Sequence, residues 1–215
     1  MRFDSERFIE ALIKQSPPHL LEHIQLVLIP LLIAFLIAFP AGIILTRPGL
    51  RRYSEKVMAI FNAGQTVPPL AVIALFFPFL GLGYRPALVA LTIYALLPIA
   101  RNTLSGISGI APEIKEAAKG MGMTGLEILL KVEIPLSIPI IMTGLKTSAV
   151  LTAGTAALAA MVGGKGMGAV IFAGINFFRP ELILAGTILI GLLAIVLDRL
   201  LTLIEYLISP SLKRV

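Results

Sequence analysis

The sequence contains no cysteine, and charged residues make up only 14% of it. Without cysteine, the chain can form no disulfide and has no thiolate for metal binding or redox chemistry. The scarcity of charge, together with a hydrophobic fraction of 57%, lies outside the usual range of soluble domains. The first 20 residues also lack a basic start followed by an apolar core, so we expect no cleavable signal peptide.

The net charge of +6 comes from Lys and Arg residues that are scattered in short segments between apolar runs. A nucleic-acid-binding protein would gather such residues in one stripe, whereas membrane proteins place them in cytoplasmic loops. The sequence therefore predicts an all-α polytopic membrane protein, multi-pass in the plasma (cytoplasmic or inner) membrane.

Five apolar stretches of 16 to 28 residues are predicted to cross a bilayer, whose hydrocarbon layer is spanned by about 20 helical residues. They are 24–46, 55–80, 86–109, 135–162 and 182–197. Arg47, Arg51, Arg52 and Lys56 follow the first stretch, which predicts a cytoplasmic loop there, an external N-terminus and a cytoplasmic C-terminus. The apolar segment 169–178 is short for a span. We expect it to be re-entrant or interfacial; a sixth span would require it to cross.

The chain divides into three parts by this pattern. Residues 1–20 form a lead-in, outside or interfacial, which is either an amphipathic helix at the membrane surface or a solvated tail. Residues 21–210 form the transmembrane domain, and residues 211–215 form a cytoplasmic tail. Lys146 lies well inside a predicted span, where it would either face the bundle interior or extend toward the membrane surface.

The second stretch is interrupted by polar residues and by the pair Pro68-Pro69. Proline removes a backbone donor and disfavours helix in the residue before it, so we expect two helices, 55–66 and 68–80, within one passage. Irregular backbone at membrane depth is tolerated where protein or a water-filled cavity surrounds it. The residues at the break are therefore candidates for a translocation path; the alternative is a helix kink packed inside the bundle.

The stretch 111–135 carries charge and helix-forming residues between almost purely apolar segments. Pro112 suits the first turn of a helix, since its missing N–H would have no partner there anyway. Glu113 and Glu116 place negative charge near the helix N-terminus, where the helix dipole favours it. Gly120 and Gly122 then end the helix.

This predicted helix exposes Ala117 and Ala118 beside Lys115 and Lys119. Small residues let the surface of another protein approach closely, and the flanking charges can fix its register. The residues alone leave two interpretations open, a docking helix and an ordinary solvated loop helix.

No catalytic or cofactor-binding pattern is apparent in the sequence. Residues 120–125, GMGMTG, match the dinucleotide-binding fingerprint, but that motif must follow a strand, and here a helix precedes it. The glycine cluster 163–168 lacks the Gly-Lys-Ser/Thr ending of a phosphate-binding loop. His19 and His23 could share a metal with Glu22, although an interfacial pair is the better interpretation. We expect no enzyme activity, no metal and no bound cofactor.

The same stretch, 111–135, resembles the cytoplasmic-loop signature of ABC importer permeases: Glu-Ala-Ala, three residues, Gly, nine residues and Ile-x-Leu-Pro. Here the signature is Glu116-Ala117-Ala118, then Gly122, then Val132-Glu133-Ile134-Pro135, with Val and Ile in place of Ile and Leu. Three further segments are similar to the subgroup that imports quaternary-ammonium osmoprotectants: FNAGQTVPPLAVIALFFPFLGLG, ALLPIARNTLSGI and AALAAMVGGKGMGAVIFAGI. The resemblance covers residues 31–203, and Lys165 departs from the usual small residue at its position.

The resemblance implies a type I ABC importer permease core of five transmembrane helices, or six if 169–178 crosses, with a cytoplasmic coupling helix. The implied partners are a second permease subunit, identical or paralogous, two ABC ATPase subunits that use ATP and Mg, and an extracytoplasmic substrate-binding protein or domain. The implied substrates are glycine betaine, carnitine, choline and proline betaine. A methionine-type or other small-solute importer permease shares these features, and a channel or secondary transporter is a more distant alternative.

The resemblance also assigns residues to the two tasks of such a subunit. Coupling to the ATPase falls to Glu113, Glu116, Ala117, Ala118, Gly120, Gly122, Met123 and Pro135. The candidates for the translocation path are Asn62, Gln65, Thr66, Pro68 and Tyr94, with Thr152 and Thr155 as weaker ones.

Overall fold

A computed structural model describes residues 4–209, and this part of the chain is mostly helical and contains no strand. The helices are α1 (Ser5–Glu10), α2 (Ser16–Ile44), α3 (Ser54–Thr66), α4 (Pro69–Leu80), α5 (Tyr84–Ser108), α6 (Pro112–Gly120), α7 (Gly125–Ile128), α8 (Ile134–Thr155), α9 (Met167–Asn176) and α10 (Pro180–Ile208). Short π or 3₁₀ segments join some of them: η1 (Ala11–Gln15), η2 (Arg51–Tyr53), η3 (Leu129–Glu133) and η4 (Ala156–Val162). The predicted tail at 211–215 lies outside the described residues.

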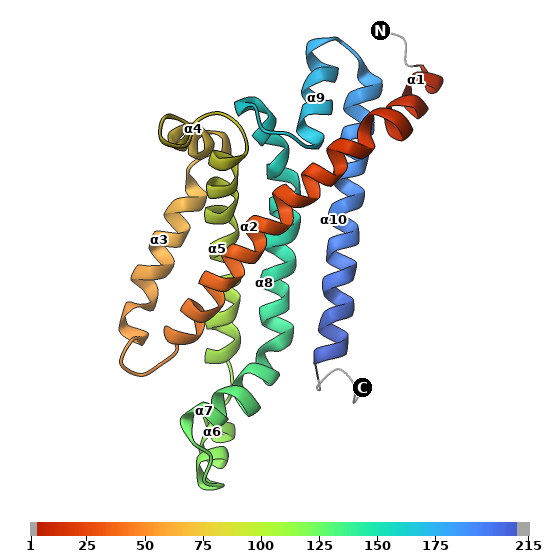
Figure 1. Ribbon diagram of the computed structural model, residues 1–215. Helices are drawn as coiled ribbons and strands as arrows, with labels where there is room; N and C mark the ends of the chain where they lie inside the picture. The colour runs from red at the N-terminus through yellow and green to blue at the C-terminus, as the bar shows by residue number, and fades with distance from the viewer. Residues whose placement is uncertain (1–3, 210–215) are drawn as a thin grey trace.

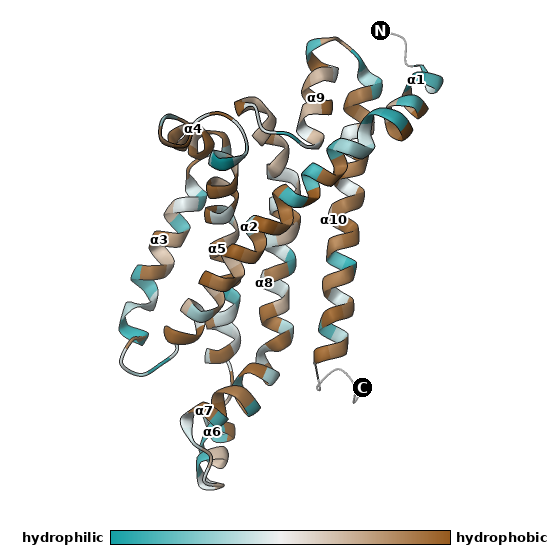
Figure 2. Cartoon of the chain, in the orientation of Figure 1, coloured by the Kyte–Doolittle hydropathy of each residue, from teal (hydrophilic) through white to brown (hydrophobic). Residues whose placement is uncertain are grey.

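The long helices α2, α5, α8 and α10 run lengthwise through the molecule, with α3 beside them (Figure 1). Four helices are long and apolar enough to cross a membrane, and the bent pair of α3 and α4 brings the number to five. Hydrophobic residues dominate the middle of the bundle, and hydrophilic ones gather toward its ends (Figure 2). Helix α1 and the described end of α10 lie at opposite ends of the bundle (Figure 1), as five passages require. The predicted all-α, five-span architecture is confirmed.

The N-terminal lead-in is helical and joins the first span without a break. Asp4 caps α1 by accepting hydrogen bonds from the backbone N–H groups of Glu6 and Arg7. The chain then passes through η1 into α2, and the Ser16 hydroxyl donates to the carbonyl of Ala11 at 2.7 Å. Ala11 is fully buried in a cluster with residues of α9 and α10. Residues 5–20 are therefore helical, and the helix continues through the predicted boundary at residue 20.

The break between α3 and α4 occurs where the sequence predicts it. Val67 and Pro68 are extended, with ψ angles of 132° and 139°, and the helices on either side meet at 92°. As a result α4 lies across one end of the bundle instead of continuing the line of α3 (Figure 1). The prediction of two helices is confirmed, and the angle between them is much larger than that of a kink.

Helix α9 stays at one end of the bundle and does not cross it (Figure 1). With 10 residues it is about 15 Å long, half the thickness of the hydrocarbon layer. The glycines that lead into it allow backbone angles that other residues avoid, as at Gly163 (φ 78°) and Gly166 (φ 96°). This arrangement agrees with the predicted re-entrant or interfacial segment.

Small residues bring the central helices close together, as expected for membrane bundles. Ala34 and Ala38 of α2, Ala95 of α5 and Ala149 of α8 share one buried cluster. At Gly144 a side-chain carbon would lie 2.5 Å from the carbonyl oxygen of Pro98. The contact between α5 and α8 therefore depends on glycine at this position.

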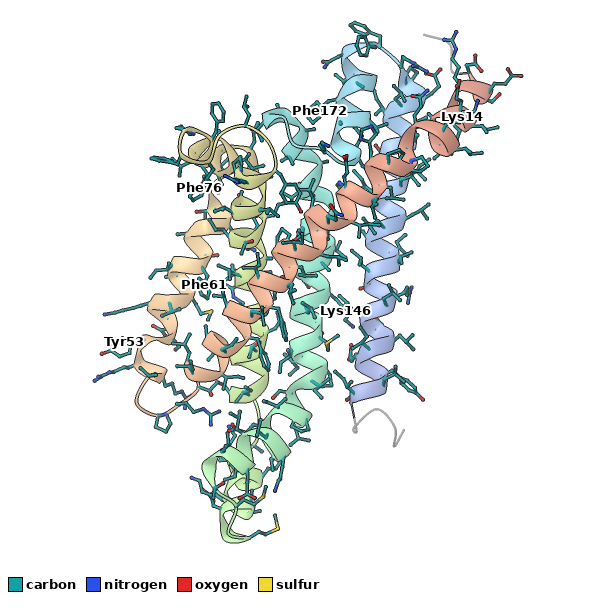
Figure 3. All side chains as sticks on the ribbon, viewed as in Figure 1. Lys14, Tyr53, Phe61, Phe76, Lys146 and Phe172 are labelled. Atoms are coloured by element: carbon teal, nitrogen blue, oxygen red, sulfur yellow. The ribbon has the colours of Figure 1, made fainter. Side chains whose placement is uncertain are left out.

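Lys146 of α8 faces the bundle interior, which decides between the two alternatives that the sequence left open. Its Nζ lies 2.7 Å from Oε2 of Glu205 on α10, and the two side chains are 20% and 11% exposed. Figure 3 shows Lys146 part-way along α8. The pair joins α10 to the rest of the bundle near the end at which the described chain stops.

Candidate functional site

The loop that contains α6 and α7 projects beyond one end of the bundle, below the ends of α5 and α10 in Figure 1. Helix α6 begins with Pro112 in its first turn after an extended Ala111. The helix ends at Gly120, where the N–H of Met121 still donates to the carbonyl of Ala117 at 3.0 Å. Gly122 then takes a φ angle of 82°, which favours glycine. The helix and its glycine stop are therefore confirmed.

The outer surface of α6 presents most of the residues that the sequence assigned to it. Glu113, Glu116 and Ala117 are exposed, and so are Gly120 and Gly122. Ala118 is different, because it is only 2% exposed. Successive residues point about 100° apart around a helix, so Ala117 faces outward while Ala118 faces this chain. The expectation that both alanines are exposed is wrong for Ala118.

Apolar side chains that are not among the predicted coupling residues add to this surface. The exposed fractions of Ile114, Met121, Leu126 and Leu130 are 43%, 75%, 65% and 55%. Several large apolar side chains on a loop outside the bundle indicate an interaction surface more strongly than scattered ones do. The signal that could have found them is the presence of Ile, Met and Leu in a segment predicted to lie outside the bilayer.

The second half of the loop starts with a capping box that fixes the chain after the glycines. Thr124 accepts from the N–H of Glu127, and Oε2 of Glu127 accepts from the N–H of Thr124. The helical stretch 125–162 has 38 residues, about 57 Å at 1.5 Å per residue, so its first turns extend beyond a hydrocarbon layer of about 30 Å. There the hydrogen bond from Lys131, followed by those from Thr124, lowers the pKa of Glu127 to about 2.

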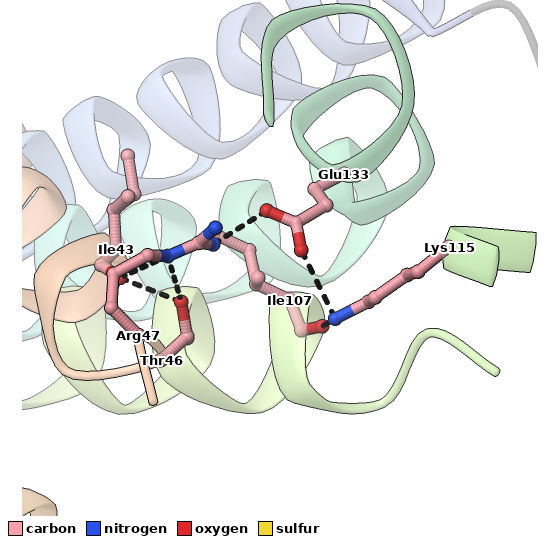
Figure 4. A network of polar contacts seen from close by, with 6 residues as sticks. All are labelled: Ile43, Thr46, Arg47, Ile107, Lys115 and Glu133. Carbon is pink, nitrogen blue, oxygen red and sulfur yellow. Dashed lines mark hydrogen bonds and ion pairs between the residues drawn. The ribbon is translucent and has the colours of Figure 1, made fainter. Parts of the chain in front are cut away.

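The buried carboxylate of Glu133 lies where this loop meets the bundle (Figure 4). Its Oε2 accepts from Nη2 of Arg47 at 2.5 Å, and its Oε1 lies 3.1 Å from Nζ of Lys115. Lys115 also donates to the carbonyl of Ile107 at 3.1 Å, and Nε of Arg47 donates to Oγ1 of Thr46 at 3.0 Å. The sequence analysis assigned no role to Glu133, whose cationic partners are 86 and 18 positions away along the chain.

The polar residues at the break between α3 and α4 lie together with Tyr94 of α5. Gln65 donates from Nε2 to the carbonyl of Tyr94 at 2.7 Å, and the Tyr94 hydroxyl donates to the carbonyl of Val67. Gln65 and Tyr94 are half-buried, whereas Asn62, Thr66 and Pro68 are exposed. The structure therefore brings five of the seven path candidates to one junction.

The two weaker path candidates lie on α8. Thr155 is half-buried and donates to the carbonyl of Leu151 in its own helix at 2.7 Å. Thr152 is 1% exposed, and among the described residues its hydroxyl has no hydrogen-bond partner. Because Thr152 faces the interior of this chain, it does not line the surface that Asn62, Thr66 and Pro68 present.

The two histidines lie at the end of the bundle opposite the α6 loop, and they contact different partners. His23 is fully buried, and its Nε2 lies 3.0 Å from the carbonyl oxygen of Ala153. His19 instead pairs with Glu22 at 3.3 Å. Glu22 also accepts from the N–H of Gly166 at 3.1 Å, which ties the glycine loop to α2. The structure therefore makes His23 a packing residue of the bundle.

Lys165 also pairs with Glu22. It stands where ABC importer permeases usually have a small residue. Its Nζ lies 3.4 Å from Oε1 of Glu22, and its side chain is 77% exposed. An exposed pair of this kind contributes at most about 1 kcal/mol, so the departure changes the surface of the loop more than its position.

Comparison with known proteins gives one family model and several relatives that cover most of the chain. Residues 38–214 match the family described as "Binding-protein-dependent transport system inner membrane component". The chain is 43% identical over 190 residues to the glycine betaine/carnitine/choline transport system permease protein OpuCB of Bacillus subtilis, covering 88% of this chain and 87% of that protein. It is 42% identical to the osmoprotectant import permease protein OsmY of Salmonella typhimurium, with 87% and 80% covered.

A solved structure has the same fold. One chain of the MetNI methionine ABC transporter, in an inward-facing conformation, superposes with a TM-score of 0.73 and covers 93% of this chain and 98% of its own. The sequence identity is 24%, so the likeness concerns the arrangement of the helices.

Proposed function

The chain belongs to the family of binding-protein-dependent transport system inner membrane components, and we propose that it is the permease subunit of an ATP-driven importer of quaternary-ammonium osmoprotectants. The observation that carries this proposal is the 43% identity to a glycine betaine/carnitine/choline permease protein along 88% of the chain. The substrate class is glycine betaine, carnitine or choline. The chain forms the passage, and partner subunits use ATP and Mg.

The exposed surface of the α6 loop is the part that we assign to the ATPase. It combines the carboxylates of Glu113 and Glu116 with exposed Ala117 and the apolar side chains of Ile114 and Met121. Small and apolar residues allow close packing, and the charges favour one register of docking. Gly120, Gly122, Met123 and Pro135 shape the turn and the return to the bundle, and Ala118 acts from the inner face of α6.

The subunit composition and the orientation follow from the same assignment. The loop of α6 lies in the cytoplasm, which places the N-terminus outside and the described end of α10 inside, in agreement with the basic residues 47–56. A second permease subunit, identical or paralogous, completes the core, two ATPase subunits dock on the α6 loops, and a binding protein or domain delivers the substrate from outside. Residues 21–210 act as the permease domain, and this chain needs no cofactor of its own.

The junction between α3 and α4 is our candidate for the path. Its exposed residues Asn62, Thr66 and Pro68 lie where the backbone is irregular, which membrane proteins tolerate inside protein or beside a water-filled cavity. Thr155 remains a weaker candidate. Thr152 would have to become exposed by a movement of α8 in order to take part.

Removing the hydrogen bond from Tyr94 to Val67 should alter transport without affecting assembly. The bond holds the extended residues at the junction, and a hydrogen bond of this kind is worth about 1 kcal/mol, which corresponds to a change in uptake rate of roughly fivefold. We expect this result for Tyr94→Phe and for Gln65→Ala, measured as initial rates of radiolabelled substrate uptake. Thr92→Val is the control, because Thr92 bonds only within α5, to the carbonyl of Leu88.

Unchanged uptake kinetics in both Tyr94→Phe and Gln65→Ala would remove the junction from the path. Loss of the ATPase from the purified complex would instead assign these residues to folding.

The substrate class is tested by rescue of growth. The chain, produced with its ATPase and binding-protein partners, should let bacteria that lack their own osmoprotectant importers grow at high salt when glycine betaine or carnitine is supplied. The same cells without the ATPase are the control. Rescue of a methionine auxotroph that lacks its own methionine importer, without rescue at high salt, would favour the methionine-type alternative.

A further inference from the structure

Glu133 connects three segments that are far apart along the chain. Arg47 follows the end of α2, Lys115 lies on α6, and Glu133 is the last residue of η3, immediately before α8. Both oxygens of the carboxylate are used, with Nη2 of Arg47 at 2.5 Å and Nζ of Lys115 at 3.1 Å. Lys115 reaches the end of α5 as well, through the carbonyl of Ile107. The carboxylate therefore joins α6 to the end of α2 and to the start of α8, and Lys115 by itself adds a contact with the end of α5.

Because the Glu133 carboxylate is buried, its ion pairs with Arg47 and Lys115 are costly to break. The Glu133 side chain is 5% exposed, while those of Arg47 and Lys115 are 36% and 27% exposed. A buried carboxylate needs compensation for the loss of its hydration, so removing one partner costs far more than removing a surface charge. The two cations hold the carboxylate in place, and the carboxylate holds the segments that carry the cations.

Helix α6 has few other anchors in the bundle. Ala118 is its one buried residue among those the structure describes, and the rest of the helix is exposed or half-buried. Without the tie to Glu133, α6 could tilt or slide while α2 stays in place. With it, a displacement of α6 carries the end of α2 along.

We propose that Glu133 is a positioning residue that transmits the movement of α6 to the end of α2. The proposal rests on the proposed function, in which α6 receives a displacement from the ATPase. It names the residues that connect α6 to the bundle: the carboxylate of Glu133 pairs with Lys115 of α6 and with Arg47, which follows α2. The residue touches neither substrate nor nucleotide.

A second ion pair in the same loop provides a matched control. Glu127 pairs with Lys131 at 2.8 Å, one helical turn apart, and the side chains are 42% and 64% exposed. This pair joins no separate segments, and exposed pairs at this spacing contribute little. Glu127→Gln removes the same charge from the same loop as Glu133→Gln does.

The first test measures uptake per ATP hydrolysed in proteoliposomes that contain the complete transporter. Glu133→Gln should keep the ATPase bound and active, while uptake per ATP falls roughly 2- to 30-fold, the range seen when residues along a coupling route are changed. Glu127→Gln should stay within about twofold of the wild type, as expected for an exposed pair. A role in folding alone would not change this ratio in the complexes that do assemble.

The second test measures the tie itself and does not depend on the substrate. Because the chain has no cysteine, spin labels can be placed at Leu50→Cys, beyond the end of α2, and at Lys119→Cys on α6. Double electron–electron resonance on the purified complex should give a narrow distance distribution in the parent and in Glu127→Gln. The distribution should be broad or shifted in Glu133→Gln. An unchanged distribution together with unchanged uptake per ATP would overturn the proposal.

Two further variants cover the case in which Glu133→Gln does not assemble. Arg47→Gln and Lys115→Gln each remove one connection, so each should lower uptake per ATP, and combining them should cost less than the product of the single effects because the tie is shared. Full uptake per ATP in both would contradict the proposal and leave Glu133 a folding residue. If the wild-type transporter takes up no osmoprotectant, the proposed function fails instead, and the label distances still test the tie.

Discussion

Glu116→Lys will abolish ATP-driven uptake while the chain still folds into the membrane. Glu116 is exposed on the part of α6 that lies outside the bundle, and among residues 4–209 it takes part in no ion pair. Reversing its charge therefore disturbs no contact within the chain. On the proposed docking surface the reversal replaces attraction by repulsion, and like charges brought together across an interface cost several kcal/mol. A loss of about 3 kcal/mol would weaken binding of the ATPase more than 100-fold.

The measurements for this variant are co-purification with the ATPase and substrate-stimulated ATP hydrolysis. Glu55→Lys is the control, since Glu55 is exposed and lies at the same end of the bundle but on α3. We expect it to retain both properties. Retention of ATPase binding and of stimulated hydrolysis in Glu116→Lys would show that α6 is not the docking element.

Lys146→Met will strongly destabilise the bundle, because it leaves Glu205 buried without its partner. The Nζ–Oε2 distance is 2.7 Å, and the Glu205 side chain is 11% exposed. Removing one member of a buried pair typically costs about 3–5 kcal/mol, and a bilayer offers the remaining carboxylate little water. For a chain of this size such a loss corresponds to a drop in apparent melting temperature on the order of 10 °C.

The test is the fraction of monodisperse protein that survives heating in detergent. The double variant Lys146→Met/Glu205→Leu removes both charges, and replacing a buried pair by apolar residues is often neutral or stabilising. We therefore expect the double variant to recover most of the lost stability. A single variant as stable as the wild type, or a double variant less stable than the single one, would contradict the role of this pair.

The main architecture could be predicted because a bilayer surrounds the chain and constrains which segments can cross it. Apolar length predicts the spans, Pro68 and Pro69 predict the break, and the 10 residues of α9 are too few to cross. Each of these depends on local sequence and on one physical constraint, the need to satisfy backbone groups in hydrocarbon. The helix α6 and the glycines that end it could also be predicted, because helix capping depends on local sequence.

The parts that could not be predicted depend on residues distant in the sequence. Glu133 pairs with Arg47, which is 86 positions away along the chain, and Lys146 pairs with Glu205, which is 59 positions away. A charge in an apolar run indicates that a partner is needed without saying which one it is. The inward position of Ala118 depends in turn on how α6 is rotated against the bundle, and helical spacing alone does not determine that rotation.

We infer that this chain forms a passage that an ATPase drives. The most direct measurement is uptake of radiolabelled glycine betaine into proteoliposomes that contain the permease with its ATPase and binding protein, with Mg-ATP on the ATPase side. We predict accumulation that requires ATP and stops when the ATPase is omitted. Uptake by the chain alone, without ATP or the ATPase, would contradict the claim and identify the protein as a channel or secondary transporter.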